Sequence, residues 1–248
     1  MSSSCFAEIE SNRNLFGKIR FRRFDKDSQV LFITIPTRVH EGLHLNLYHH
    51  FTYQLALNNL DDDWEHFGST TQRPGRDSSS GCGGEGGEAD SSGGPGTRTM
   101  GWGTLVVEAG DSQSLNELRD DMRWWFSASD HAVKIVLLIK LDRQNDQILI
   151  ERWEEVVPPP AVVTGVVTRR GAAAIAQDAT PEPALQQTII ITRDDTTDPV
   201  SYSVTRGPLV LGLSQLFLRA PTPQEADITI RIQALQQYAA RIWRRILS

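Results

Sequence analysis

The sequence has little cysteine and no long apolar stretch. Two of its 248 residues are cysteines, Cys5 and Cys82. So few thiols exclude a disulfide-stapled scaffold and a zinc site with four cysteine ligands, and they favour an intracellular, reducing compartment, the cytoplasm or the nucleus. The apolar run 135–139 is bounded by lysines, whereas a membrane-spanning helix needs about 20 apolar residues. We therefore expect no membrane span, and the opening Met-Ser-Ser-Ser-Cys-Phe-Ala predicts no secretory signal.

An excess of basic residues is also absent. The chain has 25 Lys and Arg against 31 Asp and Glu, a net charge of −6. This excludes a protein that binds nucleic acid through its overall charge, so any contact with DNA or RNA has to be local. The candidate for such a contact is the basic group Arg20, Arg22 and Arg23, which can guide a phosphate backbone. The alternative is an ordinary solvated face.

Several common catalytic signatures are missing. Neither Gly-x-x-x-x-Gly-Lys-Ser/Thr nor Gly-x-Gly-x-x-Gly opens a helix after a strand, which excludes the usual nucleotide-cofactor motifs. There is no Gly-x-Ser-x-Gly elbow to expose a serine nucleophile. Ser112 and Ser114 follow a strand without flanking glycines, so we interpret them as helix caps.

Hydrophobic periodicity predicts an α/β protein. Apolar residues recur every four positions after Thr37, which indicates a helix of about five turns capped by that threonine. Further along, a strand at 104–108, a helix and a strand at 133–141 form a crossover unit. Ser112 or Ser114 is the expected cap of its helix. Because such crossovers join parallel strands, we expect these two strands to run parallel.

Composition divides the chain into three predicted segments. They are an N-terminal lead-in at 1–36, a core at 37–157 and a C-terminal extension at 158–248. A disordered Gly/Ser insertion is expected inside the core at about 73–88, with flexible chain continuing to residue 101. The insertion lies within one domain because the segments on both sides of it look like parts of one core.

The outer segments also carry predicted elements. Residues 30–36 read as a short extended segment that ends at a proline, and 147–157 as a strand of the core. In the extension we expect a hairpin built from 189–192 and 200–205, and a short apolar helix within 209–217. A final helix is expected with an apolar stripe running from Ile228 to Ile246.

Two acids are the first candidates for chemistry. Glu108 ends a predicted buried strand, and in open α/β sheets the sites are built beyond the carboxyl ends of strands. A second carboxylate nearby, such as Asp90, gives the oxygen ligands that Mg²⁺ prefers, and such an ion can activate water at a phosphate. The alternative is an acid at a strand end in contact with solvent.

Four segments make the sequence resemble a known superfamily. They are Ala89-Asp90-Ser91-Ser92, Thr104-Leu-Val-Val-Glu-Ala-Gly-Asp-Ser-Gln-Ser-Leu115, Leu118-Arg-Asp-Asp-Met-Arg-Trp-Trp125 and Val133-Lys-Ile-Val-Leu-Leu-Ile139. This set resembles uncharacterised fungal proteins that look like restriction-endonuclease-like members of the PD-(D/E)XK superfamily. The resemblance implies a mixed sheet flanked by helices, and a nuclease that hydrolyses phosphodiester bonds of DNA or RNA with Mg²⁺ or Mn²⁺.

The resemblance also implies site residues. Asp90 matches the Asp of the "PD" element, Glu108 the acidic (D/E) position, and Glu41 an acid that some relatives add to the metal site. Gly110 stands where the superfamily has its lysine. Arg123 lies where a basic residue migrates in some relatives; it stays protonated, so it can stabilise phosphate charge but cannot act as a base.

The missing lysine leaves the activity open. Lys134 is a weaker substitute for it than Arg123. A degenerate member of the superfamily would bind nucleic acid or a protein partner without cutting. The alternative to a nuclease is therefore an interaction module that has no catalytic activity.

A second motif points to a different enzyme class. Residues 40–44 read His-Glu-Gly-Leu-His, the H-E-x-x-H pattern in which two histidines of one helix face bind zinc and the glutamate acts as base. Glu65 or His66 is the candidate third ligand of such a zinc metallopeptidase. The alternative is a His–Glu pair at a helix start with a surface His44.

Trp124 and Trp125 form an aromatic pair flanked by Arg119 and Arg123. Such a group can stack on unpaired bases. More often, tryptophans on a helix fix it to a sheet, so core packing is the preferred interpretation.

Overall fold

The computed structural model describes residues 8–9, 11–12, 15, 19–25, 28–68, 70–72, 86–98, 101–158 and 180–247. Both cysteines lie outside these residues. So does most of the predicted Gly/Ser insertion, at 73–85.

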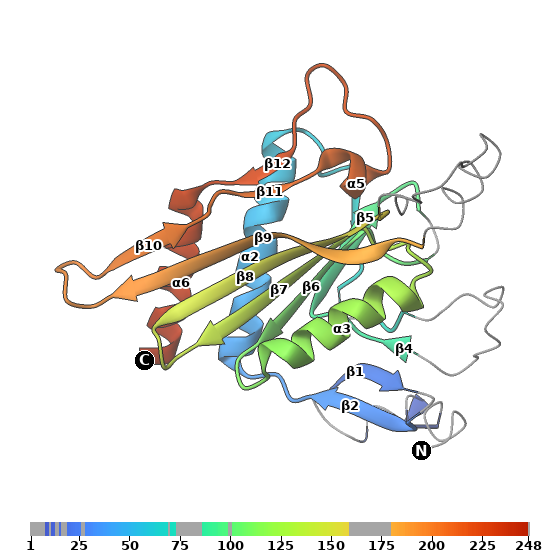
Figure 1. Ribbon diagram of the computed structural model, residues 1–248, viewed down its shortest axis with the longest axis horizontal. Helices are drawn as coiled ribbons and strands as arrows, with labels where there is room; N and C mark the ends of the chain where they lie inside the picture. The colour runs from blue at the N-terminus through green and yellow to red at the C-terminus, as the bar shows by residue number, and fades with distance from the viewer. Residues whose placement is uncertain are drawn as a thin grey trace, which may run out of the picture.

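A seven-stranded mixed sheet forms the centre of the structure (Figure 1). Its order is β10-β9-β8-β7-β6-β5-β3. The strands β6 and β7 pair in parallel, as the crossover predicted, and the other neighbours are antiparallel. The bounds are β3 Trp64–His66, β5 Ser91–Pro95, β6 Leu105–Gly110, β7 Ile135–Asp142, β8 Gln147–Val156, β9 Glu182–Asp194 and β10 Ser201–Thr205.

Helices cover both faces of this sheet. The helix α3 (Leu115–Ala128) packs on β6 and β7. The helices α2 (Arg38–Leu57) and α6 (Ile232–Leu247) pack against each other on the opposite face. Along β6, Leu105, Val107 and Ala109 join the core cluster that contains α2, whereas Val106 joins the cluster that contains α3. The predicted α/β class, a mixed sheet flanked by helices, is confirmed.

Local capping confirms the predicted helix starts. The Thr37 side chain accepts a hydrogen bond from the backbone N–H of His40 at the start of α2. Ser114, one of the two candidate caps, begins α3 in a reciprocal capping box with Glu117. Each cap satisfies backbone donors that the first turn leaves open.

The N-terminal segment forms a small sheet of its own. The strand β1 (Arg20–Asp25) pairs with β2 (Val30–Thr34) on one side and β4 (Gly86–Gly87) on the other. The segment predicted as extended at 30–36 therefore contains β2. Figure 1 shows this sheet beside α3, and Arg22 of β1 lines one cavity together with Ala109 and Gly110 at the carboxyl end of β6.

The expectation of flexible chain up to residue 101 was wrong. Ser91–Pro95 is the buried strand β5, lying between β3 and β6. A Cβ atom at Gly93 would lie 2.5 Å from the Tyr48 hydroxyl and 2.6 Å from the Glu65 carbonyl oxygen. The glycine therefore serves a close approach of α2 and β3 rather than flexibility.

The C-terminal segment extends the same sheet. The predicted hairpin is β9 and β10. The predicted helix within 209–217 is only partly correct, because β11 (Leu209–Leu211) precedes the short helix α5 (Leu213–Phe217). The final helix begins at Ile232 rather than before Ile228, because Ile228–Ile230 is strand β12, paired with β11.

The described residues were also searched for membrane-spanning helices. None of the helices among them is both long enough and apolar enough to cross a bilayer.

Candidate functional site

Five polar side chains converge near the carboxyl end of β6, and we call them the His/Asp cluster. Arg20 comes from β1 and Asp90 from the residue before β5. His40, Glu41 and His44 come from the first turns of α2. The cluster thus joins three segments that are far apart in the sequence.

Asp90 is the centre of the cluster. Its Oδ1 accepts a hydrogen bond from Arg20 at 2.9 Å, and its Oδ2 accepts one from the backbone N–H of Ala109 at 2.8 Å. The Nε2 atom of His40 lies 3.2 Å from Oδ2. Burial by itself raises the pKa of Asp90, but His40, with help from His44 and the Ala109 N–H, outweighs burial and lowers that pKa. The carboxylate is therefore ionised although only 7% of the residue is exposed.

The two histidines lie one helical turn apart with ring centroids at 5.5 Å. His44 Nδ1 lies 2.8 Å from the Ser91 hydroxyl oxygen. Its Nε2 lies 3.4 Å from Glu41 Oε1 and 3.5 Å from an Arg20 nitrogen. Burial lowers the pKa of His40, but the hydrogen bond and charge of Asp90 outweigh burial and raise it above its usual value.

Arg20 and Glu41 complete the cluster. An Arg20 nitrogen lies 2.8 Å from Glu41 Oε1. The hydrogen bond with His44 is the main reason why the pKa of Glu41 is lowered, and Arg20 contributes further. Two ionised carboxylates therefore surround one guanidinium.

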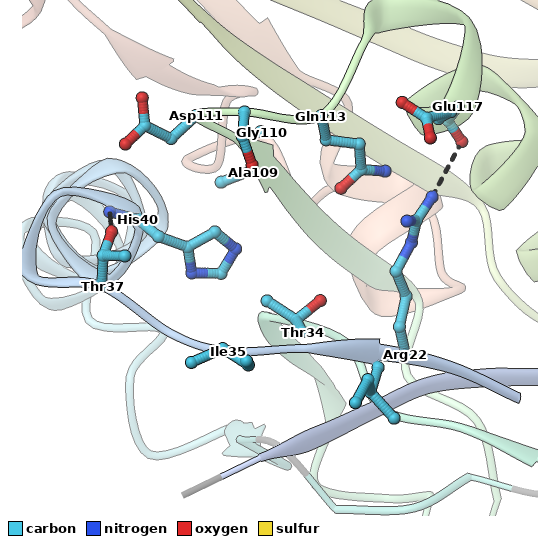
Figure 2. A pocket seen from close by; sticks show the side chains of 12 residues that line it. Arg22, Thr34, Ile35, Thr37, His40, Ala109, Gly110, Asp111, Gln113 and Glu117 are labelled. Carbon is cyan, nitrogen blue, oxygen red and sulfur yellow. Dashed lines mark hydrogen bonds between the residues drawn. The ribbon is translucent and has the colours of Figure 1, made fainter.

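A cavity of about 480 Å³ opens beside the cluster (Figure 2). The ring of His40 points into it, Arg22 lines it, and the starts of α2 and α3 border it. Two acids in its wall are already engaged. Asp111 pairs with Arg143 at 2.6 Å, and the Glu117 carboxylate accepts the backbone N–H of Ser114.

Glu108 occupies a different environment from the one expected. Its Oε1 accepts a hydrogen bond from the indole N–H of Trp125 at 2.7 Å, on the α3 side of the sheet. Burial raises the pKa of Glu108 well above its usual value, and the charges of Asp90 and Asp121 add to this effect. The side chain therefore holds its proton to higher pH than an ordinary glutamate, and it is not one of the described residues whose ligand atoms converge.

The predicted basic residues have partners inside the chain. Arg123 is 60% exposed and pairs with Asp120 at 2.8 Å, away from the His/Asp cluster. Lys134 donates to the carbonyl oxygen of His131 at 2.6 Å. Both partners, Asp120 and His131, lie outside the His/Asp cluster.

The predicted backbone-guiding arginines are mostly buried. Arg20 belongs to the His/Asp cluster, and Arg22 forms an ion pair with Asp121 while lining the cavity. Arg23 lies over the Phe32 ring, 4.7 Å from its centroid, and contacts the backbone of Asp120. Of the three, Arg22 is the one whose position fits contact with a ligand in the cavity.

The H-E-x-x-H histidines do meet a third ligand, but not the expected one. Among the described residues, His40, His44 and Asp90 offer ligand atoms within 4.8 Å of one another. His66 instead contacts the Tyr48 hydroxyl at 3.2 Å. Glu41, the base that a zinc peptidase would need, is ion-paired with Arg20, which argues against peptidase activity.

The tryptophan pair packs in the core, as preferred. Trp125 is buried against β6 and β7, and its ring contacts those of Trp102 and Trp124. Sequence reasoning missed the bond from Trp125 to Glu108, because it joins residues on different elements.

The predicted Mg²⁺ ligands Asp90, Glu108 and Glu41 do not provide the all-oxygen set that this ion requires. Glu108 accepts a hydrogen bond from Trp125 on the α3 side of the sheet, and burial raises its pKa, which weakens it as a ligand. Both oxygens of Asp90 already have partners, and a cation, Arg20, lies between Asp90 and Glu41. These residues do not fit Mg²⁺.

Comparisons with known proteins show no family for this chain. No family model matches the chain, and no curated protein matches it. Among solved structures, the chain is similar to a candidate nuclease belonging to DUF820 from Anabaena variabilis, with a TM-score of 0.37 and 9% sequence identity. The similarity covers 62% of this chain and 90% of that one.

Proposed function

We propose that this protein is a nuclease-like phosphodiesterase whose cavity beside the His/Asp cluster takes the phosphate backbone of DNA or RNA. The observation that carries the proposal is the convergence of ionised Asp90 and Glu41 with His40 at a cavity lined by Arg22. Phosphodiester hydrolysis needs a proton acceptor near water and positive charge near the phosphate, and this arrangement offers both.

The cavity favours an anion. The first turns of α2 and α3 border it, and helix N-termini carry partial positive charge and free N–H groups. Arg22 adds a guanidinium, although Asp121 neutralises part of its charge. Because Asp111 and Glu117 are engaged by Arg143 and Ser114, they repel a phosphate less than free acids would.

The His40–Asp90 pair is the proposed proton acceptor. Asp90 holds the imidazole from one side through Nε2, as an orienting carboxylate does for a general base. His40 lines the cavity, so it is the member of the pair next to water there, but its Nδ1 is buried and the ring has to turn for that nitrogen to accept a proton. The Arg22 guanidinium then lies on the side where charge develops on the phosphate.

Cleavage of labelled single-stranded DNA, duplex DNA and RNA tests this proposal. Asp90→Asn should reduce the rate by at least about 100-fold, the usual contribution of general acid–base catalysis. Arg123→Ala is the matched control and should cut like the wild type, since Arg123 lies outside the cluster. Absence of cleavage by the wild-type chain with every divalent ion tried, or equal rates for Asp90→Asn, would overturn the proposal.

A further inference from the structure

We propose that His40, His44 and Asp90 bind one borderline transition-metal ion, of the Zn²⁺ class, through two imidazole nitrogens and one carboxylate oxygen. The inference rests on the cluster used in the proposed function: with the ion bound, His40 and Asp90 would serve as its ligands instead of accepting the proton, and the ion would activate the water. The binding itself requires no nucleic acid, so it can be tested separately.

The spacing of the three side chains fits one small ion. Tetrahedral coordination with bonds of about 2.0–2.1 Å places neighbouring ligand atoms roughly 3.3 Å apart. His40 Nε2 and Asp90 Oδ2 are already 3.2 Å apart. One ligand atom from each of His40, His44 and Asp90 lies within 4.8 Å of the other two, so a side-chain rotation can complete the set.

An outer partner already orients His44. Metal-binding histidines usually donate their second ring N–H to a neighbouring oxygen, which fixes the tautomer. The Ser91 hydroxyl oxygen lies 2.8 Å from His44 Nδ1 and can accept that hydrogen. His44 Nε2 then faces the cluster, where Glu41 Oε1 lies 3.4 Å and an Arg20 nitrogen 3.5 Å away, so the metal would take the place of the contact with Glu41.

The protein alone leaves this cluster incompletely satisfied. Among the described residues, the buried His40 Nδ1 has no hydrogen-bond partner. Glu41 Oε1 lies 3.7 Å from it, but that oxygen is ion-paired with Arg20. Buried polar atoms are normally paired, so an unpaired one in a cluster of ligand-type side chains indicates a missing partner.

The ligand types select the class of ion. Imidazole suits Zn²⁺ and its transition-metal neighbours, whereas Mg²⁺ requires oxygen ligands. Two of the three side chains here are imidazoles. We therefore expect binding to be strong for Zn²⁺ and Co²⁺ and weak or absent for Mg²⁺.

Arg20 competes with the ion. Its guanidinium contacts Asp90, Glu41 and His44, which places one positive charge where the metal would bring another. The side chain has to turn away from His44 when the metal binds. Arg20→Met removes this charge and keeps an apolar stem, so metal affinity should rise.

The experiment titrates the full chain, without nucleic acid, with Zn²⁺, Co²⁺ and Mg²⁺ in a calorimeter. Co²⁺ absorption additionally reports a tetrahedral site. The variants are His44→Gln, His40→Gln and Ser91→Ala, and His66→Gln is the control because His66 binds Tyr48 instead. Circular dichroism shows whether each variant folds; if buried His44→Gln does not fold, His40→Gln and Ser91→Ala decide.

The expected result is one Zn²⁺ per chain. Ser91→Ala should weaken binding by roughly 10–100-fold, as loss of an outer partner does, and the histidine variants should weaken it more. His66→Gln should bind like the wild type. No stoichiometric Zn²⁺ or Co²⁺ binding by the wild type, or equal binding by folded His40→Gln, would overturn the inference. Metal binding without cleavage would overturn only the proposed function.

Discussion

Asp90 and Glu108 are both buried acids near the carboxyl end of β6, but their surroundings give them opposite properties. Asp90 lies among Arg20, His40 and the Ala109 N–H, and its pKa is lowered. Glu108 lies under α3 against Trp125, and its pKa is raised well above its usual value. Burial acts in the same direction on both, so the difference comes from the partners.

The alternation of side chains along β6 explains why the two acids lie in different surroundings. Glu108 and Ala109 are neighbours in β6, and successive side chains of a strand point to opposite faces of the sheet. The Glu108 side chain therefore meets the core under α3, whereas Ala109 faces α2 and its N–H binds Asp90. Two neighbouring positions of β6 thus serve different acids: Glu108 itself packs under α3, and the Ala109 N–H binds the chemically available Asp90.

The largest loss of stability is expected from a change at Trp125, the hydrogen-bond partner of Glu108. Trp125→Ala should lower the free energy of unfolding by about 3–5 kcal/mol, because it opens a cavity under α3 and leaves Glu108 without its donor. Urea denaturation followed by circular dichroism measures the loss. Trp125→Phe retains most of the ring and should lose clearly less; equal losses would mean that packing contributes little.

A smaller loss of stability is expected from a change in β5, the strand that follows Asp90. Gly93→Ala should destabilise the protein by about 1–3 kcal/mol, because the new Cβ would clash with the backbone of Glu65 and the Tyr48 hydroxyl. Thermal unfolding measures the effect. Gly96→Ala is the matched control, since its nearest atom is the Asp63 oxygen at 3.6 Å, and it should change stability by no more than about 0.5 kcal/mol. Similar values for the two variants would contradict the close-approach argument.

Stability measured across a pH range tests the difference between Glu108 and Asp90, and a smaller effect is expected. Because the folded pKa of Glu108 is raised, the native state holds this proton more tightly than the unfolded chain does. Its contribution to stability is complete below the ordinary pKa of 4.5 and is lost as the pH rises through the folded pKa.

Glu108→Gln imitates the neutral acid and should remove this contribution to the pH dependence. Its stability should therefore match or exceed that of the wild type at alkaline pH, measured by urea midpoints across the pH range. A variant whose midpoints fall with pH in parallel with the wild type would show that Glu108 is ionised in the native state.

The smallest effect is expected at Arg123. Arg123→Ala removes an exposed pair with Asp120 that is screened by solvent, so stability should change by less than about 0.5 kcal/mol. The same measurements of unfolding check this. A loss above about 1 kcal/mol would mean that Arg123 has a structural role that its exposed position does not suggest.

Much of the fold could be predicted because its signals are local. Thr37 and Ser114 act as helix caps, and a cap needs only backbone within three or four residues. The parallel pairing of β6 and β7 follows from the crossover helix between them. The errors arose where local signals mislead, as in β5, whose serines and glycines are typical of loops but here serve close packing.

The candidate site was predicted in part. Asp90, Glu41, His40 and His44 were each identified, but as members of two competing motifs rather than one cluster. Arg20 was assigned to a surface for nucleic acid, although it lies inside the cluster. No spacing in the sequence relates Arg20 to Asp90, because their contact depends on how β1 packs beside β5 and α2.

The sequence by itself determined the α/β class, the capped starts of α2 and α3 and the identities of the polar residues, because these depend on periodicity and on neighbours along the chain. Only the tertiary structure decided which acid has its pKa lowered and which has it raised. Partner charges, hydrogen bonds and burial set a pKa, and for Asp90 and Glu108 all three come from residues distant in the sequence.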